Sequence, residues 1–335
     1  MTFDEVISQW RDNSDHINVH TSGSTGSPKE ILLPKNFVRE SALRTIDFFD
    51  IKSESRLHSC VDPDFIGGKM MAIRADIAGA DFTFEKASNR PLGNISQDIT
   101  LDLVAVVPSQ MIHILENINQ MPQVANFLIG GAHIPEELRL RIAKSGLTAY
   151  ESYGMTETAS HIALRKVEEK VTPFKALPGV RISKEVDGTL IICFKNGYSL
   201  HTNDIVDLIS ETEFYVKGRK DDIINSGAKK INPRELEEKL AGILLSPFYI
   251  SGFPHEKWGE SVVLILEMRK NELETFRERE FPVVLKEMHR VLPGWMVPKE
   301  IFYVEKLVTT PNGKIKRIKD PSSLVFFAHD ICRDV

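Results

Sequence analysis

The stretch LDLVAVVPSQMIHILENINQMPQVANFLIGGAHIPEELRLRIAK, residues 101–144, decides the fold class. An apolar run at 102–107 leads into a helical pattern at 109–116, and a second run at 126–129 leads into another at 135–144. Short buried strands that alternate with helices favour a parallel sheet with helices packed on its faces. The sequence up to about residue 150 therefore predicts an α/β fold.

From about Gly179 the pattern changes to hairpins. Residues 180–194 turn at Asp187-Gly188, and residues 205–216 turn near Glu211-Thr212. Such turns connect antiparallel strands. We therefore expect the sheet to become antiparallel from about residue 179.

A polar, turn-rich stretch at 217–222 precedes a second, α+β pattern. It contains a helix that Asn232 caps and Pro233 opens, strands at 248–253 and 261–268, and a helix at 274–292. We place the boundary at Gly218. The prediction is a large domain of layered mixed sheets and helices over residues 1–217 and a small α+β domain over residues 218–335.

Composition excludes several classes of protein. The 335 residues suffice for two domains with cores of their own, and the net charge of −5 gives no general attraction to nucleic acid or an anionic membrane. The three cysteines form no CxxC pair, which disfavours a disulfide framework. The N-terminus is acidic, and no apolar run reaches the ~18 residues of a membrane span. We expect a cytoplasmic protein.

A loop rich in glycine and hydroxyl groups, TSGSTGSPK at 21–29, follows a strand-like segment at 16–20. Its candidate phosphate-binding residues are Thr21, Ser22, Gly23, Ser24, Thr25, Gly26 and Lys29. It departs from the GxxxxGK[ST] loop of kinases and GTPases, because Pro28 replaces a glycine and a strand-like ILL follows. The alternative is a flexible serine and glycine loop.

The segment ESYGMTET at 151–158 follows a strand-like run at 147–150. Tyr153, Thr156 and Glu157 suit a purine, a phosphate and a magnesium ion, at a place where α/β sheets bind ligands. The preceding strand ends in Gly130-Gly131-Ala132, which either packs a helix tightly or admits a flat ring. Read alone, each segment is also compatible with an ordinary turn.

Two further positions could bind a nucleotide. The carboxylate of Asp204 can accept both hydroxyls of a ribose, and Arg219 can add a second contact to the sugar. Near the C-terminus, TPNGKIKR at 310–317 forms a turn that holds Lys314 outward. Each residue by itself is more often an ordinary surface residue.

Taken in order, these motifs resemble the acyl-adenylate-forming superfamily of acyl-CoA synthetases, adenylation domains and firefly luciferase. The matching stretches are TSGSTGSPK, GGA, YGMTET, the Asp204 segment, GRKDDIINSGAKKINPRELE and PNGKIKR. The resemblance implies that a carboxylate and Mg-ATP give an acyl-AMP and pyrophosphate, and that a thiol such as CoA then displaces AMP. The implied ligands are therefore ATP, Mg²⁺, CoA and a small-molecule carboxylate.

Roles carry over by motif position. The loop residues named above would hold the β- and γ-phosphates, and Gly131, Ala132 and Gly154 would line the nucleotide. Tyr153 would stack on adenine, Thr156 would contact the α-phosphate, and Glu157 would bind the metal. Asp204 and Arg219 would hold the ribose.

The resemblance also implies a moving C-terminal domain. Lys314 would bridge the substrate carboxylate and the α-phosphate in the first step, and Asp221 would be the hinge. The loop at 226–228 would then face a thiol tunnel. Two departures from the family pattern are Ala228, where a glycine is common, and Asn203, where glycine usually precedes the aspartate.

Among subfamilies, TETASHIALR resembles the o-succinylbenzoate-CoA ligases of menaquinone biosynthesis. The stretch DFIGGK at 64–69 also resembles theirs, with Phe65 where they carry histidine. A substrate with two carboxylates needs a second cationic or donor-rich site. Lys69, Ser160 and His161 are the candidates, and the alternative for His161 is an ordinary packed histidine.

Typical members carry a long segment before the phosphate loop, which here begins at Thr21. We therefore expect a shortened form that exposes one side of the large domain, forms a homodimer over it, or has a smaller acyl pocket. Alternatives to the o-succinylbenzoate assignment are an enzyme that loads another aryl or short acyl acid onto CoA or a carrier protein, and a catalytically silent acyl-adenylate-binding protein. A luciferase-type oxygenase would need an apolar luciferin pocket.

Overall fold

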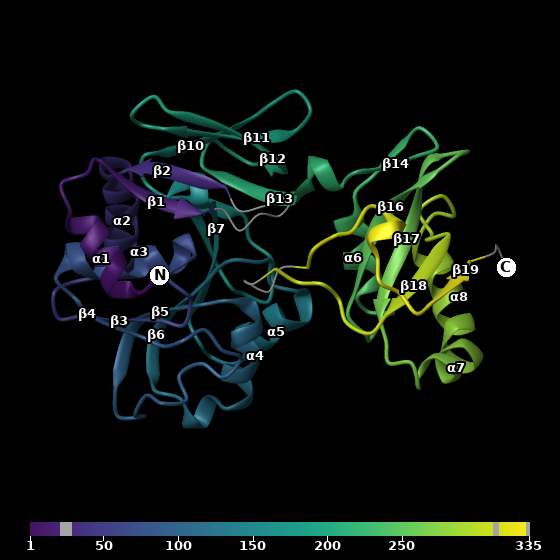
Figure 1. Cartoon of the computed structure of the whole chain (residues 1–335), viewed down its shortest axis with the longest axis horizontal. Coiled ribbons are helices and arrows are strands. Elements are labelled where there is room, and N and C mark those ends of the chain that lie inside the picture. Colours follow the sequence, from purple (N-terminus) through teal and green to yellow (C-terminus); the bar gives the residue numbers. More distant parts are fainter. Residues whose placement is uncertain (21–28, 311–314, 333–335) are drawn as a thin grey trace.

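The computed structural model describes residues 1–20, 29–310 and 315–332 of the chain. In these residues the strands form one eleven-stranded sheet, one six-stranded sheet and one two-stranded sheet. The eleven-stranded sheet and its helices, drawn in purple to teal, make up one lobe in Figure 1, and the six-stranded sheet, in green and yellow, makes up the other.

The large sheet is mixed. Its strands lie in the order β10 (Val180–Lys184), β11 (Thr189–Phe194), β12 (Ser199–Leu208), β13 (Glu213–Arg219), β9 (Phe174–Ala176), β8 (Ser160–Lys166), β7 (Ala149–Met155), β6 (Gln123–Ile129), β5 (Thr100–Val106), β3 (Arg56–Ser59) and β4 (Asp81–Phe84). The strands from β4 to β7 pair in parallel. The pairs from β7 to β10 are antiparallel. The predicted α/β fold with mixed sheets is confirmed.

The change of direction comes earlier than the sequence suggested. The expectation that antiparallel pairing starts near residue 179 was wrong, because β8 already runs antiparallel to β7. The chain reverses over the 3-10 helix η2 (Thr156–Thr158) and through Ala159 and Ser160, whose φ angles are 50° and 85°. Non-glycine residues in this left-handed region cost free energy. Such backbone conformations gather at functional sites.

Helices cover both faces of the parallel half. They are α1 (Phe3–Arg11), α2 (Lys35–Phe49), α3 (Ile66–Ala78), α4 (Pro108–Glu116) with η1 (Ile118–Gln120), and α5 (Glu136–Lys144). On β5, Leu103 and Ala105 join the core beneath α3, and the alternate residues Val104 and Val106 join the core beneath α4 and α5. Strands buried on both faces read as continuous apolar runs, which is why 102–107 was recognisable.

A separate hairpin flanks the phosphate-loop segment. β1 (His16–His20) pairs antiparallel with β2 (Glu30–Pro34), and Ile17, Val19 and Leu33 are buried. The strand predicted at 16–20 and the strand-like segment after the loop are both present. Residues 21–28, which join these two strands in the sequence, lie outside the described residues.

The six-stranded sheet has the order β15 (Lys229–Ile231), β14 (Ile224–Ser226), β17 (Gly259–Glu267), β18 (Glu300–Val304) and β19 (Ala328–Ile331), with β16 (Phe248–His255) paired to β17. Its helical segments are η3 (Lys220–Asp222), α6 (Pro233–Leu240), α7 (Leu273–Thr275), the π-helical turn η4 (Phe276–Glu280), α8 (Phe281–Val291) and η5 (Pro321–Ser323). Leu236 and Leu240 of α6 pack with Ile250 and Leu264 in one core. Among the described residues, no helix has both the length and the apolar character needed to cross a bilayer.

Local signals in the sequence explain these boundaries. The Asn232 side chain accepts a hydrogen bond from the Arg234 amide (3.1 Å), and Pro233 occupies the first helical position of α6. At the β10–β11 turn, Gly188 has φ 87° and Asp187 accepts a hydrogen bond from the Thr189 amide. Both features agree with the sequence prediction.

Candidate active site

Three residues predicted to bind the nucleoside are joined in one polar chain. The Tyr153 hydroxyl on β7 donates to Asp204 Oδ2 on β12 (2.5 Å), and Arg219 Nη1 on β13 lies 3.5 Å from Asp204 Oδ1. Asp204 and Arg219 are direct partners in the β12–β13 register. The sheet therefore brings together residues that lie 66 positions apart at the extremes, Tyr153 and Arg219.

The Tyr153 ring is held firmly. It packs against Phe174 and Phe214, with ring centroids 5.8 and 5.2 Å away. Burial, and then the adjacent Asp204 carboxylate, raise the pKa of the Tyr153 hydroxyl well above its usual value. Tyr153 is therefore a neutral hydrogen-bond donor that orients Asp204.

The same chain continues to the predicted hinge. Arg219 Nη2 lies 2.9 Å from Asp221 Oδ2, and the Asn203 amide donates to that oxygen (3.1 Å). Asn203, a departure from the family pattern, thus has a definite contact. Lys220 adds an ion pair with Asp187 of the β10–β11 turn (2.7 Å).

Other predicted residues gather at the carboxyl ends of β6 and β7. Gly131 and Ala132 follow β6, while Thr156 and Glu157 lie in η2 directly after β7. The Ser152 hydroxyl donates to the carbonyl of Ile129 (3.0 Å) and ties the two strand ends together. Parallel neighbours end at the same sheet edge, which is where this fold class binds ligands.

A glycine is required at position 154 by the close approach of two strands. A Cβ atom there would lie 2.2 Å from the Ser160 carbonyl oxygen and 2.4 Å from His161 Cα. Strand β8 therefore approaches β7 more closely than any side chain at this position allows. The glycine places Ser160 and His161 next to the candidate nucleotide residues.

Ser160 and His161, two candidate substrate residues, contact each other and a third residue that the sequence did not suggest. Arg74 Nη2 of α3 donates to Ser160 Oγ (3.3 Å), and Ser160 Oγ lies 3.5 Å from His161 Nδ1. His161 Nε2 lies 3.0 Å from the hydroxyl of Thr45 on α2. Burial, followed by the charges of Arg74 and Arg44, holds the pKa of His161 well below its usual value.

The third candidate, Lys69, lies apart from this group. Its ammonium is 2.6 Å from Met1 Sδ, and the nearby charges are those of Asp64, Asp62 and Glu5. Lys69 and Arg74 are five positions apart on α3, about 140° around the helix axis. The structure does not bring Lys69 to Ser160 and His161.

Two arginines are buried beside Ser160 and His161. Arg74 is 0% exposed and Arg44 on α2 is 9% exposed, and within the described ranges neither forms an ion pair. Arg44 Nε and Nη2 and Arg74 Nε have no hydrogen-bond partner there. Burial, and then the charge of Arg44, lower the pKa of Arg74 to about 9. A buried cation without an anionic partner is costly, and an anion bound beside it would offset that cost.

No motif marked these arginines in the sequence. Arg44 and Arg74 each sit in an ordinary helical pattern, where an arginine usually belongs to the exposed face. Only the packing of α2 and α3 against β8 turns them inward. The one available signal was Arg74 within the otherwise apolar run MMAIRA at 70–75.

Seven predicted residues lie outside the described ranges: Thr21, Ser22, Gly23, Ser24, Thr25, Gly26 and Lys314. Their flanks are described. Lys29 directly precedes β2, and Thr309 pairs with Ile315 across the segment that carries Lys314. The Lys316 amide also donates to the Val308 carbonyl (2.8 Å).

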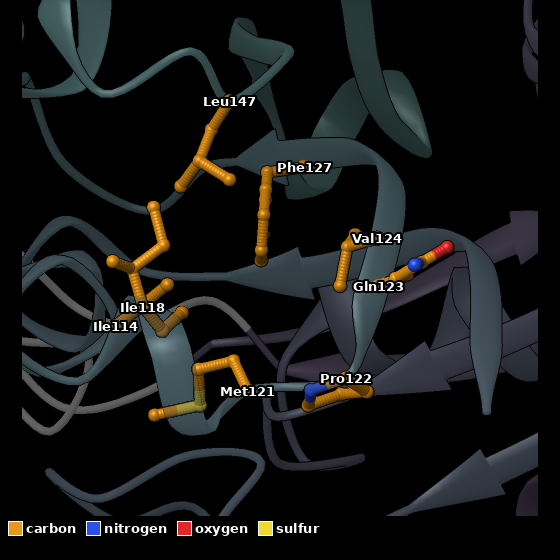
Figure 2. A pocket seen from close by; sticks show the side chains of 8 residues that line it. All are labelled: Ile114, Ile118, Met121, Pro122, Gln123, Val124, Phe127 and Leu147. Carbon is orange, nitrogen blue, oxygen red and sulfur yellow. The ribbon is translucent and has the colours of Figure 1, made fainter. Parts of the chain in front are cut away.

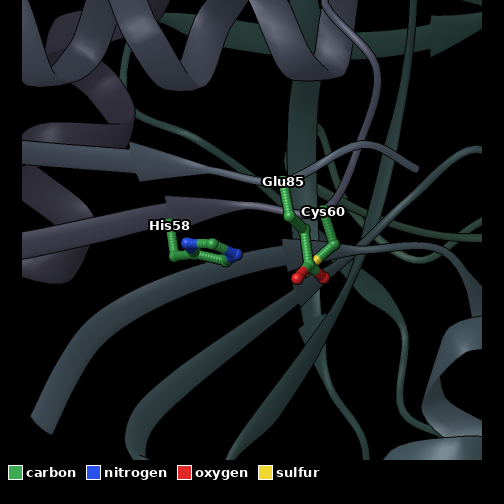
Figure 3. Close-up of side chains that lie close together, drawn as sticks. All are labelled: His58, Cys60 and Glu85. Atoms are coloured by element: carbon green, nitrogen blue, oxygen red, sulfur yellow. The ribbon is translucent and has the colours of Figure 1, made fainter. Parts of the chain in front are cut away.

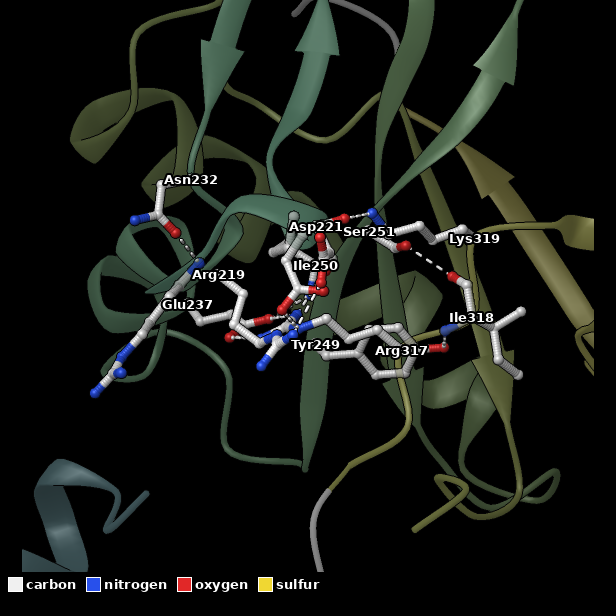
Figure 4. A network of polar contacts seen from close by, with 12 residues as sticks. Arg219, Asp221, Asn232, Glu237, Tyr249, Ile250, Ser251, Arg317, Ile318 and Lys319 are labelled. Carbon is white, nitrogen blue, oxygen red and sulfur yellow. Dashed lines mark hydrogen bonds and ion pairs between the residues drawn. The ribbon is translucent and has the colours of Figure 1, made fainter. Parts of the chain in front are cut away.

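The chain after Lys314 is anchored to the six-stranded sheet by a polar network (Figure 4). Arg317 Nη1 and Nη2 donate to the two carboxylate oxygens of Glu237 on α6, the second at 2.7 Å, and Nη1 also donates to the Ile250 carbonyl at 2.7 Å. The Ser251 hydroxyl donates to the Ile318 carbonyl (2.7 Å), and Lys319 donates to the backbone carbonyl of Asp221. The segment that follows Lys314 is therefore linked to Asp221, the predicted hinge residue.

The predicted thiol-tunnel loop is the turn between β14 and β15. Gly227 and Ala228 both have left-handed φ angles, 56° and 62°. The Gly227 amide donates to the Trp258 carbonyl (2.9 Å), the Trp258 ring stacks on His255 at 4.2 Å, and Lys229 Nζ lies 4.1 Å from the Trp295 ring centroid. A glycine at 228 would relieve strain, so the departure there has a conformational cost of about 1 kcal/mol.

A cavity of about 280 Å³ lies elsewhere on the large sheet (Figure 2). Met121, Val124 and Leu147 line it, together with other mainly apolar side chains at the start of β6. That is the amino end of the parallel strands, opposite to the edge that holds Thr156 and Glu157. The cavity is therefore separate from the candidate active site.

The fold, and the carboxyl edge of the parallel strands where Thr156 and Glu157 lie, are those of a nucleotide-binding α/β enzyme of the adenylate-forming class. A family model described as AMP-binding enzyme matches residues 8–184, more than half of the chain. The chain belongs to the AMP-binding enzyme family.

Comparison with individual proteins narrows the resemblance. The chain is 25% identical to the 2-succinylbenzoate-CoA ligase of Listeria monocytogenes, over 94% of this chain and 71% of that protein. It is 24% identical to the enzyme of the same name from Bacillus anthracis, over 89% and 68% of the respective lengths.

Two solved structures share the fold. An acyl-CoA synthetase (AMP-forming)/AMP-acid ligase II-like protein from Dyadobacter fermentans is 29% identical with a TM-score of 0.61, covering 93% of this chain and 91% of that one. The o-succinylbenzoate CoA synthetase of Bacillus subtilis, solved with an acyl-adenylate, is 24% identical with a TM-score of 0.77, over 90% and 67%. The Dyadobacter protein is thus of similar length to this chain.

Proposed function

We propose that this protein is an AMP-forming acid-thiol ligase that acts on an acid with a second carboxylate, with o-succinylbenzoate as the favoured substrate and CoA as the acceptor. The observation that carries the substrate class is the pair of buried arginines, Arg44 and Arg74, beside Ser160 and His161. A second carboxylate would neutralise them. The names of the relatives above support the same substrate.

The proposed first step uses the carboxyl edge of the parallel strands. The substrate carboxylate oxygen attacks the α-phosphorus of ATP, the new O–P bond replaces the bond to the β-phosphate oxygen, and pyrophosphate leaves. Lys314 supplies positive charge at the reacting phosphate, and Thr156 contacts the same group. Fixed charge at this place lowers the barrier without reorganisation.

The chain Tyr153–Asp204–Arg219 is proposed to hold the nucleoside. Tyr153 stacks on adenine while its hydroxyl fixes Asp204, and Asp204 accepts the ribose hydroxyls. Gly131, Ala132 and Gly154 leave room at the strand ends. The phosphate-loop residues and Lys29 bind the β- and γ-phosphates.

Magnesium fits the donors at this edge. Thr156 and Glu157 offer the hard oxygen ligands that Mg²⁺ prefers. A relative from Bacillus subtilis was solved with ATP and magnesium ion. Bound there, the ion would neutralise phosphate charge, and Glu157 would hold it.

In the proposed second step, the six-stranded-sheet lobe rotates about Asp221. The thiol of CoA then loses its proton to solvent and its sulfur attacks the acyl carbon. A C–S bond forms, the C–O bond to the phosphate breaks, and AMP leaves. The domain division at 217/218 and the homodimer remain predictions.

The direct test incubates the purified protein with Mg-ATP and o-succinylbenzoate, with and without CoA, and follows pyrophosphate, AMP and thioester by mass spectrometry. Benzoate and a medium-chain fatty acid are the control acids. We expect thioester only from o-succinylbenzoate. Pyrophosphate without thioester would favour a carrier-protein acceptor, activity with another acid would replace the substrate, and inactivity with every acid would favour a silent binding protein.

Two variants separate the parts of the proposal. Lys314→Ala should lose most acyl-AMP formation and still convert supplied acyl-AMP and CoA to thioester; an equal loss of both half-reactions would refute the assigned role.

Arg74→Met should raise the KM for o-succinylbenzoate at least tenfold and leave the KM for ATP unchanged. An unchanged KM for the acid would remove Arg74 from the substrate site.

A further inference from the structure

A second cluster, of side chains able to bind a metal ion, lies at the edge of the parallel half of the sheet, at β3 and β4. His58 is on β3, Cys60 follows that strand, and Glu85 follows β4. One ligand atom from each, an imidazole nitrogen, the thiol sulfur and a carboxylate oxygen, lie within 4.8 Å of one another, as Figure 3 shows. None of the three belongs to the candidate active site.

Strand pairing explains why they meet. β3 and β4 are parallel neighbours in which His58 faces Thr83 and Ser59 faces Phe84, and the Glu85 amide donates to the Ser59 carbonyl (3.1 Å). Residues two apart on a strand point to the same face. His58 and Cys60 therefore project together, on the face where Cys60 joins the core beneath α4 and α5.

The His58 ring has a nitrogen with no partner. His58 is 2% exposed, and within the described part of the chain its Nε2 has no hydrogen-bond partner. Its Nδ1 lies 2.8 Å from the Thr83 hydroxyl, and Thr83 Oγ1 also lies 3.5 Å from the Leu57 carbonyl oxygen that it can donate to. A Thr83 hydroxyl that donates to Leu57 accepts from a proton on Nδ1, and the tautomer proposed here therefore has its lone pair on Nε2. Figure 3 shows the His58 ring directed toward Cys60 and Glu85.

The other two ligands are also held in place. Cys60 is fully buried, and its backbone is fixed by bonds from Gln110 Nε2 to the Cys60 carbonyl (2.9 Å) and from the Cys60 amide to the Ala105 carbonyl. Glu85 Oε1 accepts a hydrogen bond from the Leu92 amide (2.9 Å). Leu92 has φ 65°, a strained conformation that holds this amide toward the carboxylate.

We propose that His58 Nε2, Cys60 Sγ and the Glu85 carboxylate bind one thiophilic divalent cation of the Zn²⁺ type. With metal–ligand distances of about 2.0–2.3 Å, tetrahedral ligand atoms lie roughly 3.5 Å apart, so small side-chain rotations suffice. The Cys60 thiol loses its proton to solvent on binding. A thiolate, a carboxylate and a neutral imidazole then balance the two positive charges of the ion.

The remaining features match a metal site rather than a chance cluster. A ligating histidine ordinarily donates its other N–H to an oxygen, as His58 does to Thr83. Three protein ligands leave a fourth position for water, which is compatible with the half-buried state of Glu85. The sulfur ligand distinguishes this site from the Mg²⁺ of the proposed reaction, since Mg²⁺ prefers oxygen.

Such an ion would join the end of β3 to the loop after β4. Because the ligands come together only in the folded chain, binding free energy adds to folding stability. We expect the ion to raise the melting temperature of the protein without contacting the nucleotide residues. The inference stands independently of the proposed function.

Binding is tested on the full chain, after removal of metal with a chelator, by titration with Zn²⁺, Co²⁺ and Mg²⁺. We expect one Zn²⁺ per chain, and for Co²⁺ a thiolate-to-metal charge-transfer absorption that Mg²⁺ does not produce or displace. Cobalt binding without that absorption, or no binding of Zn²⁺ above background, would overturn the proposal.

Variants identify the ligands. Cys60→Ser should abolish the charge-transfer absorption, and Glu85→Gln, at a half-buried position, should weaken Zn²⁺ binding about 100-fold or more. Thr83→Val should weaken it about 10- to 100-fold through the His58 tautomer. Cys193→Ser, which changes a cysteine outside the cluster, is the matched control. Unchanged Zn²⁺ affinity in both Cys60→Ser and Glu85→Gln would refute the site.

Discussion

Single residues at the candidate active site have more than one contact. The Tyr153 hydroxyl bonds Asp204 while its ring packs on Phe174 and Phe214, and His161 contacts Thr45 with one ring nitrogen and faces Ser160 with the other. The contacts of Tyr153 bear on nucleotide binding, and those of His161 bear on how the free energy of unfolding depends on pH.

Tyr153 can be dissected by two substitutions. Tyr153→Ala removes the ring and should raise the KM for ATP about tenfold, because stacking of a base on an aromatic ring contributes about 1–3 kcal/mol. Tyr153→Phe keeps the ring and loses only the bond to Asp204, so its KM should lie between those of wild type and Tyr153→Ala. An unchanged KM in Tyr153→Ala would place the adenine elsewhere.

His161 should make stability depend on pH. Its folded pKa lies below the ordinary value of about 6.5, so below that pH the unfolded chain binds the extra proton and the free energy of unfolding falls. One such group contributes at most about 1.4 kcal/mol per pH unit. In urea titrations between pH 7 and pH 5, His161→Gln should therefore lose less stability than wild type.

The control for this experiment is His16→Gln, the same substitution at an exposed position of β1, and it should follow wild type. His58, whose pKa burial also lowers, contributes a slope of the same sign that persists in His161→Gln. If the His161→Gln and wild-type slopes coincided, the buried neutral state assigned to His161 would be wrong.

At this scale the sequence predicted residue types better than contacts. Tyr153, Asp204 and Arg219 were each assigned to the nucleoside, and the structure joins them directly. Arg74 was not predicted, because its only signal was the apolar run at 70–75 around it, and an arginine in a helix is usually exposed. Lys69 was a candidate because it is the cation of the stretch DFIGGK at 64–69, but its ammonium lies against Met1 and not beside Ser160 and His161.

Among the elements, α6 and the returning chain at 315–319 form one unit. Glu237 on α6 receives both terminal nitrogens of Arg317, three residues after Lys314. Residues 315–319 follow Lys314 directly in the sequence, so the contacts that hold them bear on the placement of Lys314. We therefore propose the Glu237–Arg317 pair as a positioning contact for the proposed first step.

Glu237→Gln tests this contact. It removes one of the two carboxylates that pair with Arg317 and leaves only the longer contact, in which Asp222 Oδ2 lies 3.6 Å from Arg317 Nε. The acyl-AMP half-reaction should therefore slow about tenfold while conversion of supplied acyl-AMP to thioester stays within twofold. The matched control is Glu238→Gln, whose carboxylate instead pairs with Arg234 on the same helix. A similar loss in both half-reactions would indicate general destabilisation of the lobe.

Elements with local signals were predictable, and the one that depends on backbone strain was not. Asn232 and Pro233 indicate the start of α6, and Asp187-Gly188 indicates the β10–β11 turn. The reversal at Ala159 and Ser160 uses left-handed residues that no sequence rule favours, so the change to antiparallel pairing was placed too late. No pattern in the sequence predicts the β3–β4 register that brings His58 close to Glu85.

For the whole molecule, the decisive segment is η3. Arg219 ends β13 of the large sheet, Asp221 is the middle residue of η3, and Ile224 begins the six-stranded sheet. The proposed rotation between the two half-reactions would take place within these few residues. Arg219, which is proposed to contact the ribose, thus lies two positions before Asp221, the proposed hinge.

Asp221→Pro should fix the arrangement described above. Proline holds φ near −65°, which a 3-10 turn accepts, so the variant should fold and adenylate while losing thioesterification. Asp221→Ala is the control, because it removes the carboxylate contacts to Arg219 and Asn203 but leaves the backbone free to turn. Wild-type rates of both half-reactions in Asp221→Pro would place the hinge elsewhere.

The tryptophans offer a way to watch such a rotation. Of the three, Trp258 and Trp295 border the 226–229 turn, whereas Trp10 lies on α1 in the other lobe. Intrinsic fluorescence of this protein is therefore weighted toward the part proposed to move. Mixing acyl-AMP-loaded protein with CoA in a stopped-flow instrument should give an emission change that Trp10→Phe retains and Trp295→Phe diminishes, an optical record of the rotation without any added label.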